Sequence, residues 1–104
     1  MKIDQYLLEA LKQKASDLHF ISGDPVRARV NGSLGILINE RLTTECVQEA
    51  VFEIMDGAAK RTFQELDAVD FAYEIADVSR FRVNAFRHLN GIGAIFRAIP
   101  SKAM

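Results

Sequence analysis

The segment from residue 80 to 99, RFRVNAFRHLNGIGAIFRAI, constrains the fold more than any other part of the chain. Two strand-like runs flank Asn90-Gly91, and Asn-Gly is typical of a two-residue hairpin turn because both residues tolerate positive φ. If Asn90 and Gly91 form the turn, Asn84 pairs with Arg97, and the pairs on either side follow by counting outward. The segment therefore predicts an antiparallel hairpin with a defined register.

Alternation along the two predicted strands assigns each side chain to one of two faces. One face is apolar and comprises Phe81, Val83, Ala85, Ala94, Phe96 and Ala98. The other face carries Arg80, Arg82, Asn84 and Arg97, with Phe86, Ile95 and Ile99 among them. Guanidinium groups on rigid strands present forked donors to a phosphate or a carboxylate. The second face is therefore a candidate anion-binding surface.

Composition sets the class of protein. The 104 residues suffice for one domain with a real core. Thirteen basic residues against fourteen acidic ones give a net charge of −1, which argues against nucleic-acid binding. Cys46 is the single cysteine, so an internal disulfide is excluded and a reducing compartment is favoured. With no signal peptide and no long apolar run, the expected location is the cytoplasm.

Periodicity predicts the remaining elements. Helical spacing is expected over residues 3–15, 43–55 and 58–66, with Thr43 as an N-cap and Gly57 ending the helix before it. Strands are expected over residues 18–21, 26–30, 34–38 and 69–75, with Asn31-Gly32 as a second turn. The connections are too short for parallel crossovers, so the predicted class is antiparallel α+β.

Four motifs carry a resemblance to a known family. They are ASDLHFISGDPVRARVNG (15–32), LTTECVQEAVFEIM (42–55), DFAYEI (70–75) and RFRVNAFRHLNGIGAIFRAIPSK (80–102). Together they resemble the N-terminal domain of the type IV pilus twitching-motility (PilT-like) ATPases of the secretion ATPase superfamily. The resemblance implies a PAS-like antiparallel sheet of about six strands, with helices packed on one face. It places this domain at residues 1–99 and the start of a linker to a RecA-like ATPase domain at 100–104.

The resemblance also implies a function: a regulatory and assembly domain of a hexameric pilus retraction motor, which closes over nucleotide and supplies arginines to its phosphates. The matching positions are Arg82 and Arg97, with Arg80 and Arg87 as further candidates. The implied partners are the RecA-like motor domain of the same protein, neighbouring subunits and platform proteins of the inner membrane, where the assembled motor would be peripheral.

The chain lacks one motif that the family's activity requires. It contains no G-x-x-x-x-G-K-[ST], since none of the six glycines precedes a lysine. It therefore corresponds to an excised N-terminal domain, which alone should neither hydrolyse ATP nor need a cofactor. ATP and magnesium belong to the full-length protein.

Several alternatives stay open at this point. Arg82 and Arg97 could instead form ordinary ion pairs with Asp70, Glu74 or another acid. Asp17-x-His19 places a carboxylate and an imidazole on one strand face, where a structural hydrogen bond or an interface role is favoured over a metal site, since no third ligand is identified. Asn84 is assigned a similar structural role. A different function, a free-standing PAS-type ligand sensor or interaction module, would require an internal pocket with convergent polar groups.

Overall fold

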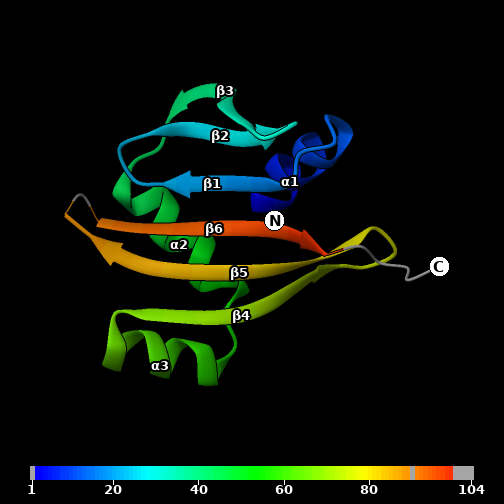
Figure 1. Ribbon diagram of the computed structural model, residues 1–104. Coiled ribbons are helices and arrows are strands. Elements are labelled where there is room, and N and C mark those ends of the chain that lie inside the picture. The colour runs from blue at the N-terminus through cyan, green and yellow to red at the C-terminus, as the bar shows by residue number, and fades with distance from the viewer. Residues whose placement is uncertain (1, 90, 100–104) are drawn as a thin grey trace.

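Residues 2–89 and 91–99, which the computed structural model describes, form three helices and six strands in the predicted order (Figure 1). The elements are α1 (Lys2–Lys12), β1 (Asp17–Ile21), β2 (Pro25–Val30), β3 (Ser33–Arg41), α2 (Thr44–Ile54), α3 (Gly57–Leu66), β4 (Ala68–Ile75), β5 (Ser79–His88) and β6 (Gly91–Ile99). The predicted α+β class is confirmed. The predicted linker at 100–104 lies outside the described residues.

The six strands form one open antiparallel sheet in the order β3-β2-β1-β6-β5-β4. The first three strands and the last three are each continuous in sequence, and β1 joins the two groups by pairing with β6 (Figure 1). This pairing places Asp17 opposite Arg97, although 80 residues separate them in the sequence. The pairing thereby places Asp17 of the ASDLH motif beside Arg97 of the FRAIPSK motif at the centre of the sheet.

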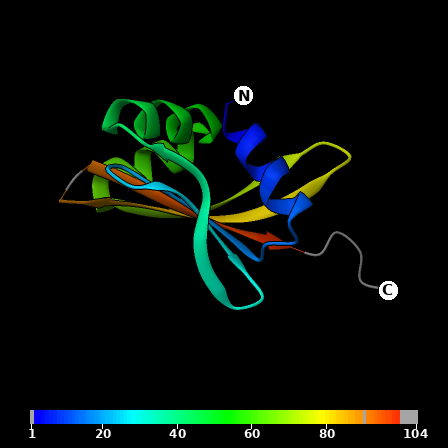
Figure 2. The same ribbon diagram turned by 90° about the horizontal axis from the view of Figure 1, so that it is seen from above.

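Helices α1 and α2 lie on the same side of the sheet, while the other side stays open (Figure 2). Thr43 caps α2 as predicted, accepting a hydrogen bond from the Cys46 backbone N–H at 3.1 Å. Gly57, which was expected to end α2, is instead the first residue of α3, and the Asp56 side chain caps that helix by accepting from Ala59 N at 2.7 Å. None of the described helices has the length and apolar character of a membrane span.

Two tyrosines tie α1 to strands at opposite edges of the sheet. The Tyr6 hydroxyl donates to Glu40 on β3 at 3.1 Å, and the Tyr73 hydroxyl on β4 donates to Asp4 at 2.5 Å. Burial, reinforced by the hydrogen bond to Asp4, raises the pKa of the Tyr73 phenol. The helix therefore spans the curved sheet and closes the core from one end.

The apolar face predicted for the hairpin is confirmed. Its side chains point toward the helices and are buried or nearly so: Phe81, Val83, Ala85, Ala94, Phe96 and Ala98. The rings of Phe81 and Phe96 meet edge to face at 6.4 Å and 81°. The predicted arginines of the opposite face are exposed, as alternation requires.

The predicted hairpin register is wrong by two residues. Arg82 pairs with Arg97, not with Ile99, and the last pair before the turn is His88 with Gly91. Strand β5 therefore continues to His88 and β6 begins at Gly91, and Asn90 lies outside the described residues. A shift of two preserves the parity of every position, so the assignment of faces survives the error.

Tertiary contacts at the start of β6 explain the shifted register. Ser22 Oγ donates to Ile92 O at 2.6 Å and accepts from Ile92 N at 3.2 Å, so the first residues of β6 are held at the β1–β2 turn. Gly91 has φ +124°, and a Cβ there would lie 2.7 Å from Thr44 Cγ2. This glycine is needed for a close approach to α2, which overrides the local preference for an Asn-Gly turn.

Candidate functional site

Most of the candidate site residues named in the sequence analysis lie on the open face of the sheet, which is the side away from the helices. By register and alternation, five arginines lie on it: Arg27 and Arg29 from β2, Arg80 and Arg82 from β5, and Arg97 from β6. The acidic residues on this face are Asp17 from β1 and Asp70 and Glu74 from β4. The resulting excess of positive charge is local, since the whole chain carries a net charge of −1.

Arg82 and Arg97 stand directly opposite each other on adjacent strands. Together with Asp70, Asn84 and Ile95 they line an open pocket of about 360 Å³. The structure therefore brings together three of the residues singled out in the sequence. Like charges directly opposite each other destabilise a sheet unless other charges compensate them.

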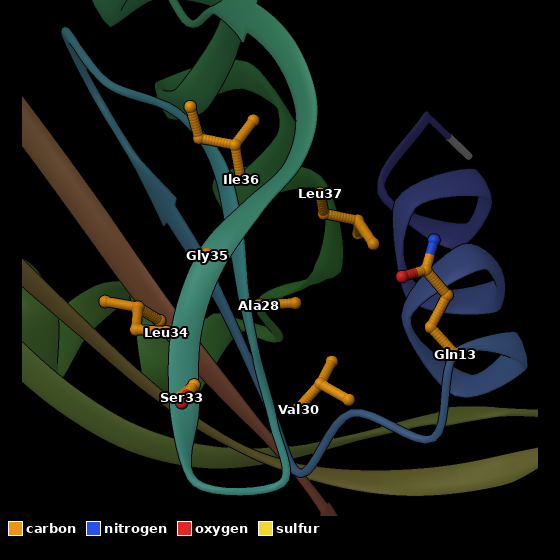
Figure 3. Close-up of a pocket in the computed structure, with 8 residues that line it drawn as sticks. All are labelled: Gln13, Ala28, Val30, Ser33, Leu34, Gly35, Ile36 and Leu37. Carbon is orange, nitrogen blue, oxygen red and sulfur yellow. The ribbon is translucent and has the colours of Figure 1, made fainter.

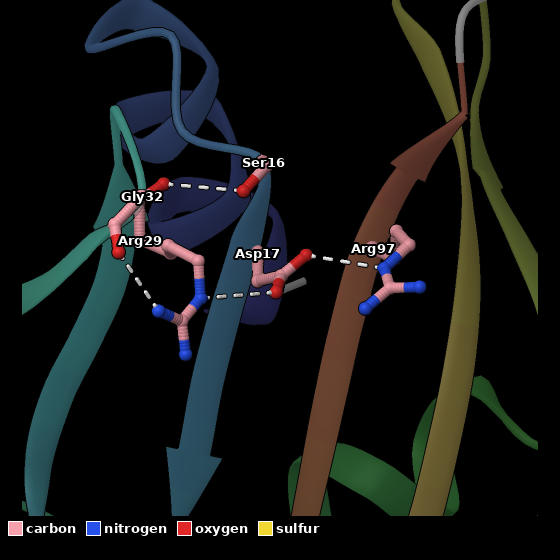
Figure 4. A network of polar contacts seen from close by, with 5 residues as sticks. All are labelled: Ser16, Asp17, Arg29, Gly32 and Arg97. Carbon is pink, nitrogen blue, oxygen red and sulfur yellow. Dashed lines mark hydrogen bonds and ion pairs between the residues drawn. The ribbon is translucent and has the colours of Figure 1, made fainter.

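Asp17 compensates one of the two arginines. Arg97 Nε lies 3.3 Å from Asp17 Oδ1, and Arg29 Nε approaches the other oxygen, Oδ2, at 3.5 Å (Figure 4). Asp17 is only 8% exposed, whereas the Arg97 side chain is 70% exposed. Arg29 is held in turn by its Nη1, which donates to Gly32 O at 3.1 Å. Asp17 thus joins three neighbouring strands through its side chain.

Arg82 differs from Arg97 in that no described residue serves as its counter-ion. Among residues 2–89 and 91–99 it makes no hydrogen bond or ion pair that meets ordinary distance limits, and its Cα partner on the other side is Ala72. Asp70, the acidic residue that lines the pocket, instead accepts a hydrogen bond from Asn84 Nδ2 at 3.0 Å. The alternative of an ordinary ion pair with Asp70, Glu74 or another acid is therefore met for Arg97, which pairs with Asp17, whereas the described residues show no such pair for Arg82.

The two further candidates lie in different places. Arg80 is exposed on the same face as Arg82, opposite Glu74 and Ile99, and does not line the pocket. Arg87 lies on the helix side of the sheet and so does not share the open face with Arg82. It donates through Nε to Asp67 at 3.0 Å, and its guanidinium stacks 5.0 Å from the centre of the Phe63 ring. Odd positions of β5 face the helices, which is why Arg87 fastens α3 rather than serving the open face.

His19 shares the open face with Asp17, as predicted, and its Cα partners are Arg27 and Ile95. Partial burial lowers the pKa of the His19 imidazole, and the nearby Arg29 and Arg27 lower it further, while Asp17 opposes them. A neutral imidazole at pH 7 follows from this balance. Within the described part of the chain, no three His, Cys, Asp or Glu side chains are grouped as metal ligands.

A second pocket, of about 210 Å³, lies between β3 and the end of α1 (Figure 3). Its lining is mostly aliphatic: Ala28, Val30, Leu34, Ile36 and Leu37, with Gln13, Ser33 and Gly35. The Gln13 amide donates to Glu9 at 2.8 Å. The pocket thus lacks the charged groups that make the Arg82–Arg97 pocket a candidate for chemistry.

The chain is similar in sequence and in structure to part of known ATPases. No family model matches the chain. The Pseudomonas aeruginosa type IV pilus retraction ATPase PilT is 39% identical over 104 residues, which is all of this chain and 30% of that protein. The crystal structure of the pilus retraction motor PilT with bound ADP superimposes with a TM-score of 0.91 at 30% identity, over the whole chain and 31% of the solved one. Over its whole length the chain therefore matches the N-terminal domain of the PilT-like ATPases.

The PilT-like assignment extends to a related ATPase. The Legionella pneumophila ATPase DotB matches with a TM-score of 0.84 and 28% identity, over 97% of this chain and 29% of that one. The chain spans about a third or less of the relatives it matches. The comparisons thus concern this PilT-like domain only.

Sequence reasoning missed one member of the site. Arg29 lies in the alternating run from Val26 to Val30, and this pattern indicates only a strand with one polar face. That pattern gives the face but not the partner, since the contact with Asp17 depends on β1 lying between β2 and β6. The ion pair between Arg97 and Asp17 in this PilT-like domain therefore depends on the order of the strands in the sheet.

Proposed function

We propose that the chain is the N-terminal regulatory and assembly domain of a hexameric ATPase of the pilus retraction type, and that it closes over nucleotide and brings Arg82 and Arg97 to the phosphates. The observation that carries the proposal is the placement of these two arginines opposite each other in one open pocket. The similarity to PilT and DotB supports the wider role within such a motor.

The chemistry of the two side chains suits phosphate. Arg82 has all its donors unused by the described residues, and Arg97 uses only Nε within the domain, which leaves its two terminal nitrogens. A guanidinium fork matches the geometry of phosphate oxygens. Cations placed against a transferring phosphoryl group lower its barrier by several kcal/mol. If they arrive only when the domain closes, hydrolysis is coupled to movement.

The pocket lined by Arg82 and Arg97 does not suit a magnesium ion. The wall of the pocket is cationic, and its one acid, Asp70, is hydrogen-bonded to Asn84. Mg²⁺ favours carboxylates, phosphates and water, so it would arrive with ATP and take its protein ligands from the motor domain. The partners that we propose are that motor domain, the neighbouring subunits and the inner-membrane platform of the pilus machinery, at the cytoplasmic side.

The alternative of a ligand sensor has less support. The partly open pocket between α1 and the sheet measures about 10 Å³, which is the space of a single water. The buried polar side chains among the described residues, Asp17 and Ser22, bond within the fold. A sensor needs a larger internal pocket into which polar groups converge. A filled core with arginines outside suits a motor domain's partner better.

The proposal is tested by turnover in a full-length protein that contains this domain. We expect Arg82→Ala and Arg97→Ala each to lower kcat by about ten-fold to 1,000-fold, the range for losing one positioned cation. Melting midpoints should stay close to the parent, since an exposed ion pair contributes only about 0–1 kcal/mol. The double variant should lose less than the product of the two single losses, because both residues serve one transition state.

Two controls sharpen this experiment. Arg61→Ala removes an exposed arginine from α3, away from the pocket, and should leave turnover unchanged. Arg97→Lys should restore little, since an ammonium cannot form the two-donor fork. Parental turnover in the double variant, or a loss that follows unfolding, would assign the two arginines to structure.

A further inference from the structure

The contact between Arg97 and Asp17 uses one particular nitrogen. Nε of Arg97 lies 3.3 Å from Asp17 Oδ1, and the two terminal nitrogens extend beyond it without a hydrogen bond to any described residue (Figure 4). An arginine side chain that is 70% exposed would otherwise sample many rotamers. The Nε contact restricts that freedom while it leaves the outer edge of the guanidinium available.

Asp17 is well suited to hold another side chain in place. It lies on β1 with Arg29 and Arg97 as its Cα partners on the two sides, and it is nearly buried. Its second oxygen faces Arg29 Nε at 3.5 Å, and Arg29 is itself fixed by its bond to Gly32 O. The carboxylate is therefore held from both sides by paired strands.

The charges of this cluster do not cancel. One carboxylate lies between two guanidiniums, Arg29 and Arg97, so the group keeps a net positive charge. A one-to-one ion pair would leave Arg97 nearly neutralised as seen by an incoming anion. Sharing Asp17 with Arg29 thus orients Arg97 without cancelling its field in the pocket that it lines with Arg82.

We propose that Asp17 is the positioning residue for Arg97: it holds Nε so that the terminal nitrogens serve the pocket beside Arg82, while Arg29 offsets the charge of the carboxylate. That the ligand is a chain of nucleotide phosphates rests on the proposed function. The orientation of Arg97 is a property of this chain and is measured separately.

The first measurement needs no ligand. In the ¹⁵N-labelled chain, the Nε–H signal of Arg97 should exchange with water more slowly than that of Arg82, because Arg97 Nε–H donates a hydrogen bond to Asp17 and Arg82 donates none to a described residue. Asp17→Asn keeps the shape of the side chain and removes its charge. It should accelerate exchange at the Arg97 Nε–H group by about three- to ten-fold, since charge-assisted hydrogen bonds are the stronger ones. Unchanged exchange at Arg97 would overturn the proposal.

The second measurement uses tripolyphosphate as the probe, titrated into the same chain. Asp70→Asn is the matched control, because it removes the same charge from the pocket without touching an arginine. Removing a negative charge should raise the affinity of Asp70→Asn by about two-fold. Asp17→Asn should instead lower it by about three- to ten-fold, since the orientation of Arg97 is lost. Equal gains in both variants would contradict a positioning role.

Arg97→Lys is the substitute test if Asp17→Asn fails to fold, because the side chain at position 97 is exposed to solvent. A lysine cannot give one nitrogen to Asp17 and others to phosphate, so this variant should bind tripolyphosphate about as weakly as Arg97→Ala. Parental affinity in Arg97→Lys would overturn the proposal. If the parent chain binds no tripolyphosphate while Arg97 Nε–H shows the expected protection by Asp17, the proposed function fails and the positioning of Arg97 stands.

Discussion

Replacing Phe96 with alanine tests the packing on which the candidate site rests. Phe96 lies in the middle of β6, is 1% exposed, and has Leu18 of β1 and Val83 of β5 as Cα partners. Its ring meets Phe81 edge to face. The backbone that carries Arg97 is therefore anchored, one residue earlier, in the centre of the core.

The expected cost follows from this burial. A buried Phe→Ala change removes a large apolar surface and leaves a cavity, which together cost about 3–5 kcal/mol. The close contact with Phe81 places the value in the upper part of that range. A domain of 104 residues has a total stability of about 5–15 kcal/mol, so the loss is a large fraction of it. The melting midpoint should fall by about 15–30 °C.

Urea and thermal unfolding of the purified chain measure this effect, with Phe86→Ala as the control. Phe86 is half-buried on the open face, where its ring lies over Gly93. Its truncation should cost about 1–2 kcal/mol, because only part of its surface is buried. A midpoint for Phe96→Ala within a few degrees of the parent, or equal losses in the two variants, would refute the assignment of the two faces.

Two further predictions concern pH and the start of β6. Because the pKa of His19 is lowered by burial, the unfolded chain binds its proton more readily, so the free energy of unfolding should fall as pH decreases through about 6.5. His19→Gln should flatten that part of a urea-midpoint curve, and an unchanged slope would exclude this residue as the cause. Gly91→Ala should destabilise by about 1–3 kcal/mol, since its φ is +124° and Thr44 is too close. Gly35→Ala, with open space around it, should be near neutral in the same melts, and equal losses would reject the close-approach argument.

Local patterns were sufficient to predict the elements and the faces of the sheet. The alternation of Val26, Ala28 and Val30 with two arginines fixes which side of β2 is polar, and no tertiary information is needed for that. The N-cap of α2 was likewise local, since Thr43 bonds the backbone three residues later. The order and direction of these elements follow from chain connectivity and short loops.

What the sequence could not provide was the register and the partners. Ser22 and Ile92 are 70 residues apart, yet their hydrogen bonds fix where β6 begins and so displace the expected turn. The same holds for Asp17 and Arg97, which meet only because β1 is inserted between β2 and β6. Periodicity reports the face on which a side chain lies, but the neighbour across a strand boundary depends on which strands pair.

The arrangement of charge around Arg82 does not stabilise the fold. Arg82 stands opposite Arg97 on one side and Ala72 on the other, so neither of its directly opposite Cα partners is an acid, and among the described residues it forms no ion pair with Asp70 or Glu74 of β4. Opposite charges in such positions would stabilise the sheet, and like charges weaken it. Arg97 is compensated by Asp17, which is already shared with Arg29. Departures from local rules of this kind concentrate at functional sites. Under the proposed function, a bound phosphate group would supply negative charge here, in the open pocket that the two arginines line.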